Sequence, residues 1–177
     1  MRRISLTAAV LLGSSAFGTA AFADPYAPVN PASDTIHVGL EIVDECTLTA
    51  TDLSFGSHGI ILNQITGDAT VTIECTHDTP YHVGLSDGQS GDTADRFMTV
   101  GGSGDQVHYQ LYSDSGYGNI WGSDQGVDTV DGSGTDDTID LPVYGKIDAH
   151  QNVAAGNYTD TITATVWYAG SYTTPGP

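Results

Sequence analysis

The chain has 177 residues, of which 22 are acidic and only four are Lys or Arg, so its formal charge at pH 7 is −18. This balance excludes nucleic acid as a partner and argues against anionic lipid, because both are bound through clusters of basic side chains. Abundant carboxylates instead favour solubility and mutual repulsion, as is common among secreted proteins.

The first 23 residues are predicted to be an export signal. Arg2 and Arg3 form a positive start, residues 4–17 are largely apolar, and residues 21–23 read Ala-Phe-Ala, an A-x-A cleavage pattern. The apolar stretch is too short and too interrupted to span a bilayer, so we expect no membrane insertion; an N-terminal anchor helix is the alternative. Cleavage would leave 154 of the 177 residues, a single domain, with formal charge −20.

Residues 24–45 are predicted to be a linker followed by an arm. Three prolines between residues 24 and 34 favour an extended linker over a packed element. In residues 35–43 apolar side chains fall at every second position, which in an extended chain places them on one face. These side chains are Ile36, Val38, Leu40 and Ile42. Such a strand can pair within its own domain, or it can leave and complete another one.

Two cysteines, Cys46 and Cys75, follow the export signal. In an exported protein a single structural disulfide is the expected state of such a pair. Closing a loop of this length should stabilise the fold by ~3–4 kcal/mol on the chain-entropy model.

After the arm, four runs of alternating apolar residues predict half-buried strands. The runs contain Val71, Ile73 and Cys75; Val107, Tyr109 and Leu111; Ile139, Leu141 and Val143; and Ile162, Ala164, Val166 and Tyr168. Segments rich in Gly, Asp and Ser separate them, and the longest, residues 122–137, is predicted to form no element of its own. Because no stretch has a helical period, we expect an antiparallel β-sandwich. Pro142 suggests that its strand is an edge strand or is bulged.

The folded domain is expected to span residues 46–168 and to be followed by a tail, residues 169–177. The tail lacks an alternating apolar row and ends in Pro-Gly-Pro. It therefore makes a poor final strand.

Several short motifs recur in an order and spacing that resemble a known family. They are the arm before Cys46, Leu53-Ser54-Phe55-Gly56, Val71-Thr72-Ile73-Glu74-Cys75, Tyr109-Gln110-Leu111-Tyr112-Ser113-Asp114 with Trp121-Gly122, Leu141-Pro142-Val143-Tyr144-Gly145-Lys146-Ile147, and the segment from Gly156 to Val166. Together they resemble the spore coat U domain proteins, the subunit type of archaic (Csu-like) chaperone–usher pili.

The resemblance implies an incomplete immunoglobulin-like β-sandwich that lacks its last strand. Members of that family are exported to the periplasm, held there by a chaperone, and polymerised at an outer-membrane usher into an extracellular fibre. In the polymer the arm of one subunit fills the groove of the next by strand addition. Carried onto this chain, the donor-strand face is Ile36, Val38, Leu40 and Ile42, and the last-strand core face beside the groove is Ile162, Ala164, Val166 and Tyr168.

Two alternatives concern the arm and the class of function. The arm could be the first strand of a closed monomeric sandwich. The chain could also be a secreted monomeric binding module, for glycans or another surface ligand, with Tyr117, Trp121 and Trp167 as exposed contacts. A secreted hydrolase is a third possibility that only the compartment supports.

Catalytic and metal-binding patterns are weak in this sequence. Its six histidines form neither HxH nor HExxH, and the acidic residues after Gly122 do not follow the EF-hand spacing. There is no G-x-S-x-G motif, and both cysteines are assigned to the disulfide. We therefore expect no enzyme, no metal and no cofactor.

Overall fold

The computed structural model describes residues 32–169. The predicted export signal, most of the linker and all of the tail after Ala169 lie outside the described residues. The chain divides into two units after Leu40, the arm up to that residue and the domain that follows it.

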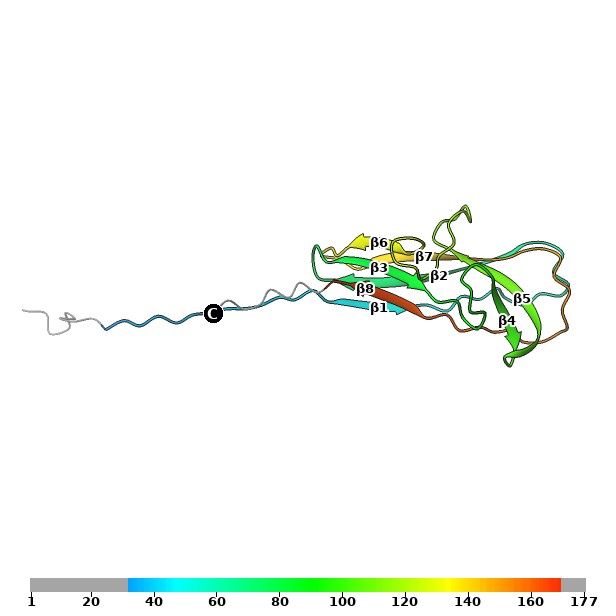
Figure 1. Ribbon diagram of the computed structural model, residues 1–177, viewed down its shortest axis with the longest axis horizontal. Helices are drawn as coiled ribbons and strands as arrows, with labels where there is room; N and C mark the ends of the chain where they lie inside the picture. The colour runs from blue at the N-terminus through cyan, green and yellow to red at the C-terminus, as the bar shows by residue number, and fades with distance from the viewer. Residues whose placement is uncertain (1–31, 170–177) are drawn as a thin grey trace, which may run out of the picture. The chain divides into compact units, whose positions relative to one another are not determined.

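The domain consists of eight antiparallel strands in two sheets (Figure 1). The five-stranded sheet has the order β1 (Cys46–Ala50), β2 (Ile65–Cys75), β7 (Ile139–Ile147), β5 (Ser103–Tyr112) and β4 (Arg96–Val100). The three-stranded sheet has the order β6 (Val130–Ser133), β3 (Pro80–Leu85) and β8 (Ala164–Tyr168). No helix occurs within residues 32–169, and so none that is long and apolar enough to cross a membrane.

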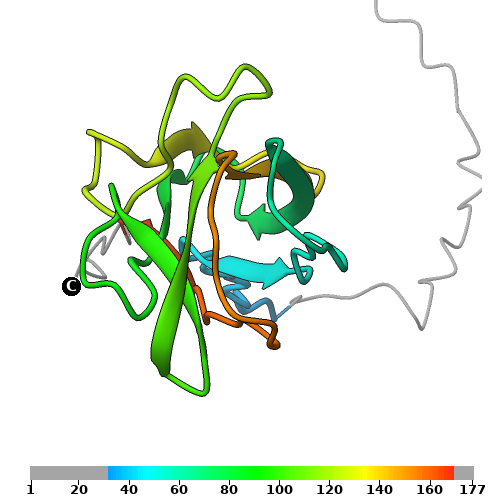
Figure 2. The same ribbon diagram turned by 90° about the vertical axis from the view of Figure 1, so that its right-hand side faces the viewer.

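The core lies between the two sheets, which curl around it when the domain is viewed end-on (Figure 2). Alternate residues of each inner strand face it, as the period of two requires. The most buried members are Val71, Ile73 and Cys75 of β2, Tyr81, Val83 and Leu85 of β3, Val107, Tyr109 and Leu111 of β5, and Val143 and Ile147 of β7. The predicted β-sandwich is therefore confirmed, and Cys75 lies in its core.

Residues 122–137 differ from the prediction, because they contain the strand β6. Its burial pattern is one half-buried residue followed by three exposed ones, so its side chains give no apolar alternation. Backbone pairing to β3, with Val83 opposite Val130, holds it in place instead. A four-residue strand with mostly exposed side chains has no hydrophobic periodicity from which it could be predicted.

The expectation that Pro142 marks an edge strand or a bulge is wrong, because β7 is an inner strand with a regular register. Pro142 lies opposite Thr70 of β2. The N–H of Thr70 donates to Thr51 Oγ1 and its C=O accepts from Thr51 N, so both groups point away from β7. This pair therefore exchanges no hydrogen bonds, and the proline nitrogen faces away from β2. β5 pairs with β7 only at residues 144–146, so the missing N–H interrupts no ladder.

A buried arginine ties the two sheets together. Arg96, at the start of β4, is 0% exposed, and its guanidinium donates hydrogen bonds to neutral acceptors. They run from Nε to Ser86 O (2.9 Å), from Nη1 to Thr93 O (3.1 Å) and Gln110 Oε1 (2.6 Å), and from Nη2 to Leu85 O (3.0 Å) and Trp121 O (2.8 Å). Burial lowers the pKa of Arg96 below its ordinary value.

Replacing Arg96 by Met should destabilise the domain by about 3 kcal/mol or more, because several buried carbonyl groups lose a charged donor. Urea unfolding measures this as a lower midpoint with an unchanged slope. Lys146→Met is the matched control. It removes a cation that bonds to the exposed Asp148 at 3.1 Å, so we expect a loss of at most about 1 kcal/mol. Equal losses in the two variants would contradict the structural role given to Arg96.

Candidate functional site

Each sheet ends in an edge strand, and two of these edges lie next to each other. β1 is one edge of the five-stranded sheet and β8 is one edge of the three-stranded sheet. The two strands run side by side (Figure 1), yet β1 pairs with β2 and β8 pairs with β3. Among the described residues no ladder joins β1 to β8, so the sandwich has an unfilled strand position there.

The register shows which backbone groups of β8 are left on that side. Ser86 N donates to Thr163 O at 2.9 Å, so Thr163 directs its backbone toward β3. Leu85, the partner of Ala164, instead donates its N–H to Gly122 O at 2.8 Å, away from β8. Because hydrogen-bonding direction alternates along an antiparallel pair, Ala164 and Val166 present their N–H and C=O groups to the free edge. Such an edge is a template for another strand.

Beside this edge the core opens into a cavity of about 490 Å³, which we call the groove. It lies between residues 50–55, which follow β1, and residues 158–164, which lead into β8. Apolar side chains of both sheets reach it, among them Val71, Leu85, Leu111 and Val143. Three small residues, Ala50, Ala69 and Ala164, also line it and leave room for larger side chains.

One wall of the groove is set by Leu53 and Phe55, which lie against the glycines of neighbouring strands. A Cβ atom on Gly145 would come within 2.8 Å of Leu53 Cδ1 and 2.9 Å of Phe55 Cζ. The Phe55 ring then meets Tyr109 edge-on, with 6.0 Å between ring centroids. Gly145 therefore allows the segment after β1 to cover β7 without closing the groove.

Asp160 is the charged residue of the opposite wall, and it is held by three hydrogen bonds. Tyr109 Oη donates to it at 2.7 Å, and the backbone N–H groups of Gln89 and Thr161 donate at 3.0 and 2.7 Å. Burial and this carboxylate raise the pKa of Tyr109 far above its ordinary value. The Asp160 carboxylate is thus satisfied by donors of the domain itself.

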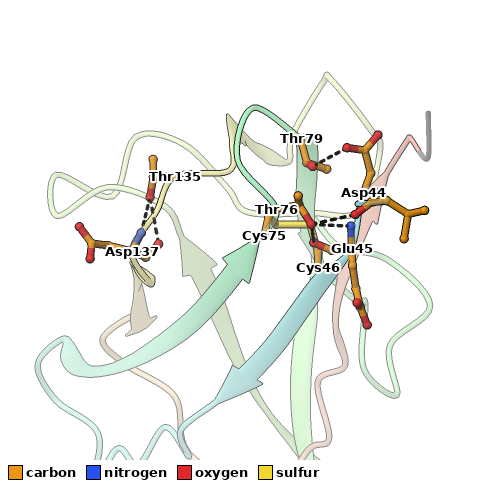
Figure 3. Close-up of a disulfide and its surroundings, with 9 residues drawn as sticks. Asp44, Glu45, Cys46, Cys75, Thr76, Thr79, Thr135 and Asp137 are labelled. Atoms are coloured by element: carbon orange, nitrogen blue, oxygen red, sulfur yellow. Dashed lines mark hydrogen bonds between the residues drawn. A yellow bond between two sulfur atoms is a disulfide. The ribbon is translucent and has the colours of Figure 1, made fainter. Parts of the chain in front are cut away.

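The arm joins the domain at the predicted disulfide, which the structure contains. Cys46 and Cys75 are bonded, and they stand directly opposite each other in the β1–β2 register, with 4.1 Å between their Cα atoms. Just before Cys46, residues 43–45 bond to Thr76 and Thr79 (Figure 3). We call this set, Val43, Asp44, Glu45, Thr76 and Thr79, the arm-root clamp.

The predicted donor face is exposed. No strand is assigned to residues 32–45, and Ile36, Val38, Leu40 and Ile42 are 89, 92, 86 and 71% exposed. A continuous row of exposed large apolar side chains is uncommon on soluble proteins and marks an interaction site. The role of this face as a donor strand stays a prediction.

The predicted face of the last strand is only partly brought to the groove. Ile162 and Ala164 line the cavity, and Val166 is half-buried against the core. Tyr168 is 40% exposed and does not line it, and β8 begins at Ala164, so Ile162 precedes the strand. The sequence analysis did not single out the lining residue Leu85, and it predicted Val143 only as part of a half-buried strand.

The aromatic residues considered for ligand binding are mostly used inside the domain. Trp121 is 1% exposed, and its Nε1 donates to Val83 O at 2.8 Å, so the expectation that it is an exposed contact is wrong. Trp167 is half-buried beside Gly84, and Tyr117 packs edge-on against Tyr112 at 5.4 Å. Within residues 32–169, no three His, Cys, Asp or Glu side chains are grouped to hold a metal ion.

Comparison with known families agrees with this architecture. The sequence profile of the Spore Coat Protein U domain matches residues 32–165. The chain belongs to the Spore Coat Protein U domain family. The resemblance drawn from its motifs is thereby confirmed, and no curated protein sequence matches the chain.

Two solved structures that are similar to this chain come from pilus systems. One is a chain of the CsuC–CsuE chaperone–tip adhesion subunit pre-assembly complex from archaic chaperone-usher Csu pili of Acinetobacter baumannii, with 24% identity and a TM-score of 0.52. That match covers 70% of this chain and 39% of the other. The second is the E. coli Hda pilus minor tip subunit HdaB, with 16% identity, a TM-score of 0.39, and coverage of 68% and 79%. The first likeness supports the immunoglobulin-like fold expected from the sequence.

Replacing Tyr109 by Phe should make stability less sensitive to alkaline pH. The folded state keeps the Tyr109 phenol protonated, because its pKa is raised above 10.0, whereas the unfolded chain ionises it near pH 10. Only the unfolded state then loses the proton, so wild-type stability falls as pH rises beyond 10. At pH 11 this loss is about 1.4 kcal/mol, and the Phe variant should lack it.

Urea unfolding at pH 9 and pH 11 measures the difference. Burial also raises the pKa of Tyr81, but Tyr81 is present in both proteins and cancels from the comparison. Identical pH dependence of the two proteins would show that Tyr109 is not held protonated in the fold.

Proposed function

We propose that the protein is a structural subunit of an extracellular pilus or surface fibre, polymerised by strand exchange through a chaperone–usher pathway. One observation carries the proposal: the same chain has an exposed apolar arm and an open groove beside an unpaired strand edge. Each is unfavourable alone, because exposed apolar rows and free edges promote association. Insertion of one into the other satisfies both.

The arm and the groove edge match in period and length. The arm has its apolar residues at 36, 38, 40 and 42, and the edge has apolar residues with the same period at 162, 164, 166 and 168, of which Tyr168 is 40% exposed. At ~3.3 Å per residue each row is about 20 Å long. Burying the four arm side chains would contribute ~6–12 kcal/mol of apolar transfer, less the costs of ordering and association.

Strand exchange between identical chains has a geometric consequence. The donor surface is the arm and the acceptor surface is the groove, so the contact is heterologous. After one exchange, one of the two subunits still has a free arm and the other still has an empty groove. Such contacts build open linear assemblies unless the rotation closes a ring. The product of repeated exchange is therefore a fibre, and no catalytic role is needed.

The route of assembly follows from the state of the free subunit. A subunit with an empty groove and a free β8 edge would pair wrongly during export. We propose that a periplasmic chaperone occupies the groove first and that an outer-membrane usher exchanges it for the next arm. The complex from A. baumannii, in which a chaperone holds a tip adhesion subunit, supports this order by analogy.

The alternative, a secreted monomeric binding module, is less well supported. Of its three aromatic candidates, Trp121 is in the core, and Trp167 and Tyr117 are half-buried against other residues. The binding-module alternative also does not explain the exposed apolar side chains of the arm.

Replacing Leu40 by Asp should abolish polymerisation, because strand exchange would place a carboxylate in the apolar groove without a partner. Polymers are scored on unheated, non-reducing gels, where strand-exchanged assemblies run as a ladder that heating collapses. Capture by a chaperone through the groove should be unchanged, since the groove itself is unaltered.

His37→Asp is the matched control. It introduces the same carboxylate three residues away on the alternate face of the arm, so the ladder should persist. Normal fibres from the Leu40 variant, or equal loss in both variants, would remove the arm's apolar face from the mechanism. Deleting residues 24–43 should leave a domain that accepts an arm but donates none.

A further inference from the structure

We propose that Thr76 and Thr79 are positioning residues that keep the arm from entering the groove of its own chain. They would thereby leave it available to a second copy. This inference rests on the proposed function, since it concerns which copy receives the arm. The observation behind it is the arm-root clamp, the hydrogen bonds that hold residues 43–45 immediately before the disulfide.

Because the arm is tethered to its own domain, insertion into its own groove competes with insertion into the groove of a neighbour. A fibre-forming subunit must avoid the first. The donor row ends at Ile42 and β1 begins at Cys46, so only residues 43–45 separate the arm from its own domain. A segment on so short a tether has an effective concentration on the order of millimolar if the geometry permits insertion. At lower subunit concentrations, a chain's own arm would therefore fill its groove before a neighbour's arm could.

The strand directions define what such self-insertion would require. β3 starts at Pro80, directly after the clamp residue Thr79, and its residue Tyr81 lies opposite Tyr168 at the end of β8. β8 thus ends beside the arm root, and the groove opens farther along, between residues 50–55 and 158–164. To fill it, the chain's own arm must reverse at residues 43–45 and run back along β1. A neighbour's arm needs no such reversal.

The clamp opposes that reversal through hydrogen bonds from Thr76 and Thr79 to residues 43–45. Thr76 Oγ1 accepts from Glu45 N at 3.1 Å and donates to Val43 O at 3.1 Å, and Thr76 N donates to Glu45 O at 2.9 Å. Thr79 Oγ1, on a residue that is 1% exposed, donates to Asp44 Oδ1 at 2.8 Å (Figure 3).

These bonds continue the β1–β2 pairing past the disulfide and keep residues 43–45 in line with β1. A turn at the same residues would break the bonds to Val43 and Asp44. It would also leave the buried Thr79 hydroxyl without that acceptor, which is unfavourable.

The test is the double variant Thr76→Val and Thr79→Val, which keeps side-chain shape and removes both hydroxyls. Wild type and variant, each starting at Asp24, are refolded by dilution over a range of concentrations with the disulfide intact. Unheated gels then separate the heat-sensitive ladder from compact, heat-sensitive monomers, the product expected of self-insertion. The variant's ratio of ladder to compact monomer should fall by roughly tenfold or more, because it lacks the two hydrogen bonds, to Val43 and Asp44, that a turn would have to break.

Two further variants separate positioning from simple loss of stability. Thr47→Val with Thr49→Val makes the same change at two exposed positions of β1 and should leave the ratio unchanged. Adding Leu40→Asp to the clamp variant should remove the compact monomer, because that species depends on an inserted arm. Thr76→Val alone keeps the Thr79 bond, so it should shift the ratio in the same direction by less.

The outcomes of the two proposals are distinguishable. A wild-type chain that forms no ladder at any concentration contradicts strand exchange itself. A wild-type ladder with the same ratio in the clamp variants overturns the positioning role and leaves the proposed function standing. A compact monomer that survives Leu40→Asp also overturns it, since that monomer would not contain the inserted arm.

Discussion

The unpaired edge of β8 is the constraint on which the rest of the structure depends. Ala164 and Val166 offer backbone groups to a strand that the described domain does not contain, and the core is open beside them. A closed sandwich would fill that position with its own last strand. Here the arm contains a further alternating apolar row, so under the proposed strand exchange the same event would complete the fold and join two subunits.

The domain keeps its shape around this opening through interactions placed away from it. The disulfide joins β1 to its neighbour β2 at the arm root, and the Arg96 network ties β4 and β5 to the end of β3. On the groove walls, Gly145 seats the segment after β1, and Tyr109 holds Asp160. If the groove accepts a strand as proposed, these contacts pre-form it and limit the ordering cost of insertion largely to the arm.

Features that depend on one short segment or one residue pair could be predicted from the sequence, and features assembled from distant segments could not. Alternating apolar residues predicted β2, β5 and β7, and the cysteines predicted the disulfide, because one short segment or one pair contains the whole signal. β6 has exposed side chains and is held by backbone pairing, so it left no pattern. Nothing in the sequence around Arg96 distinguishes this buried arginine from one on the surface. The groove was not predictable in detail, because its lining comes from segments far apart in the chain, including Leu53, Leu85 and Val143.

The most direct test of strand exchange is amide hydrogen exchange at Ala164 and Val166. The sample is the chain starting at Asp24 with Leu40→Asp, which cannot donate its own arm, measured with and without a synthetic peptide of residues 32–45. Strand addition predicts that the peptide slows exchange at both amides, since they gain acceptors on the free edge, and leaves Thr165 unchanged because it already faces β3. Unchanged exchange at Ala164 and Val166 with saturating peptide would contradict the assignment of this edge as the acceptor.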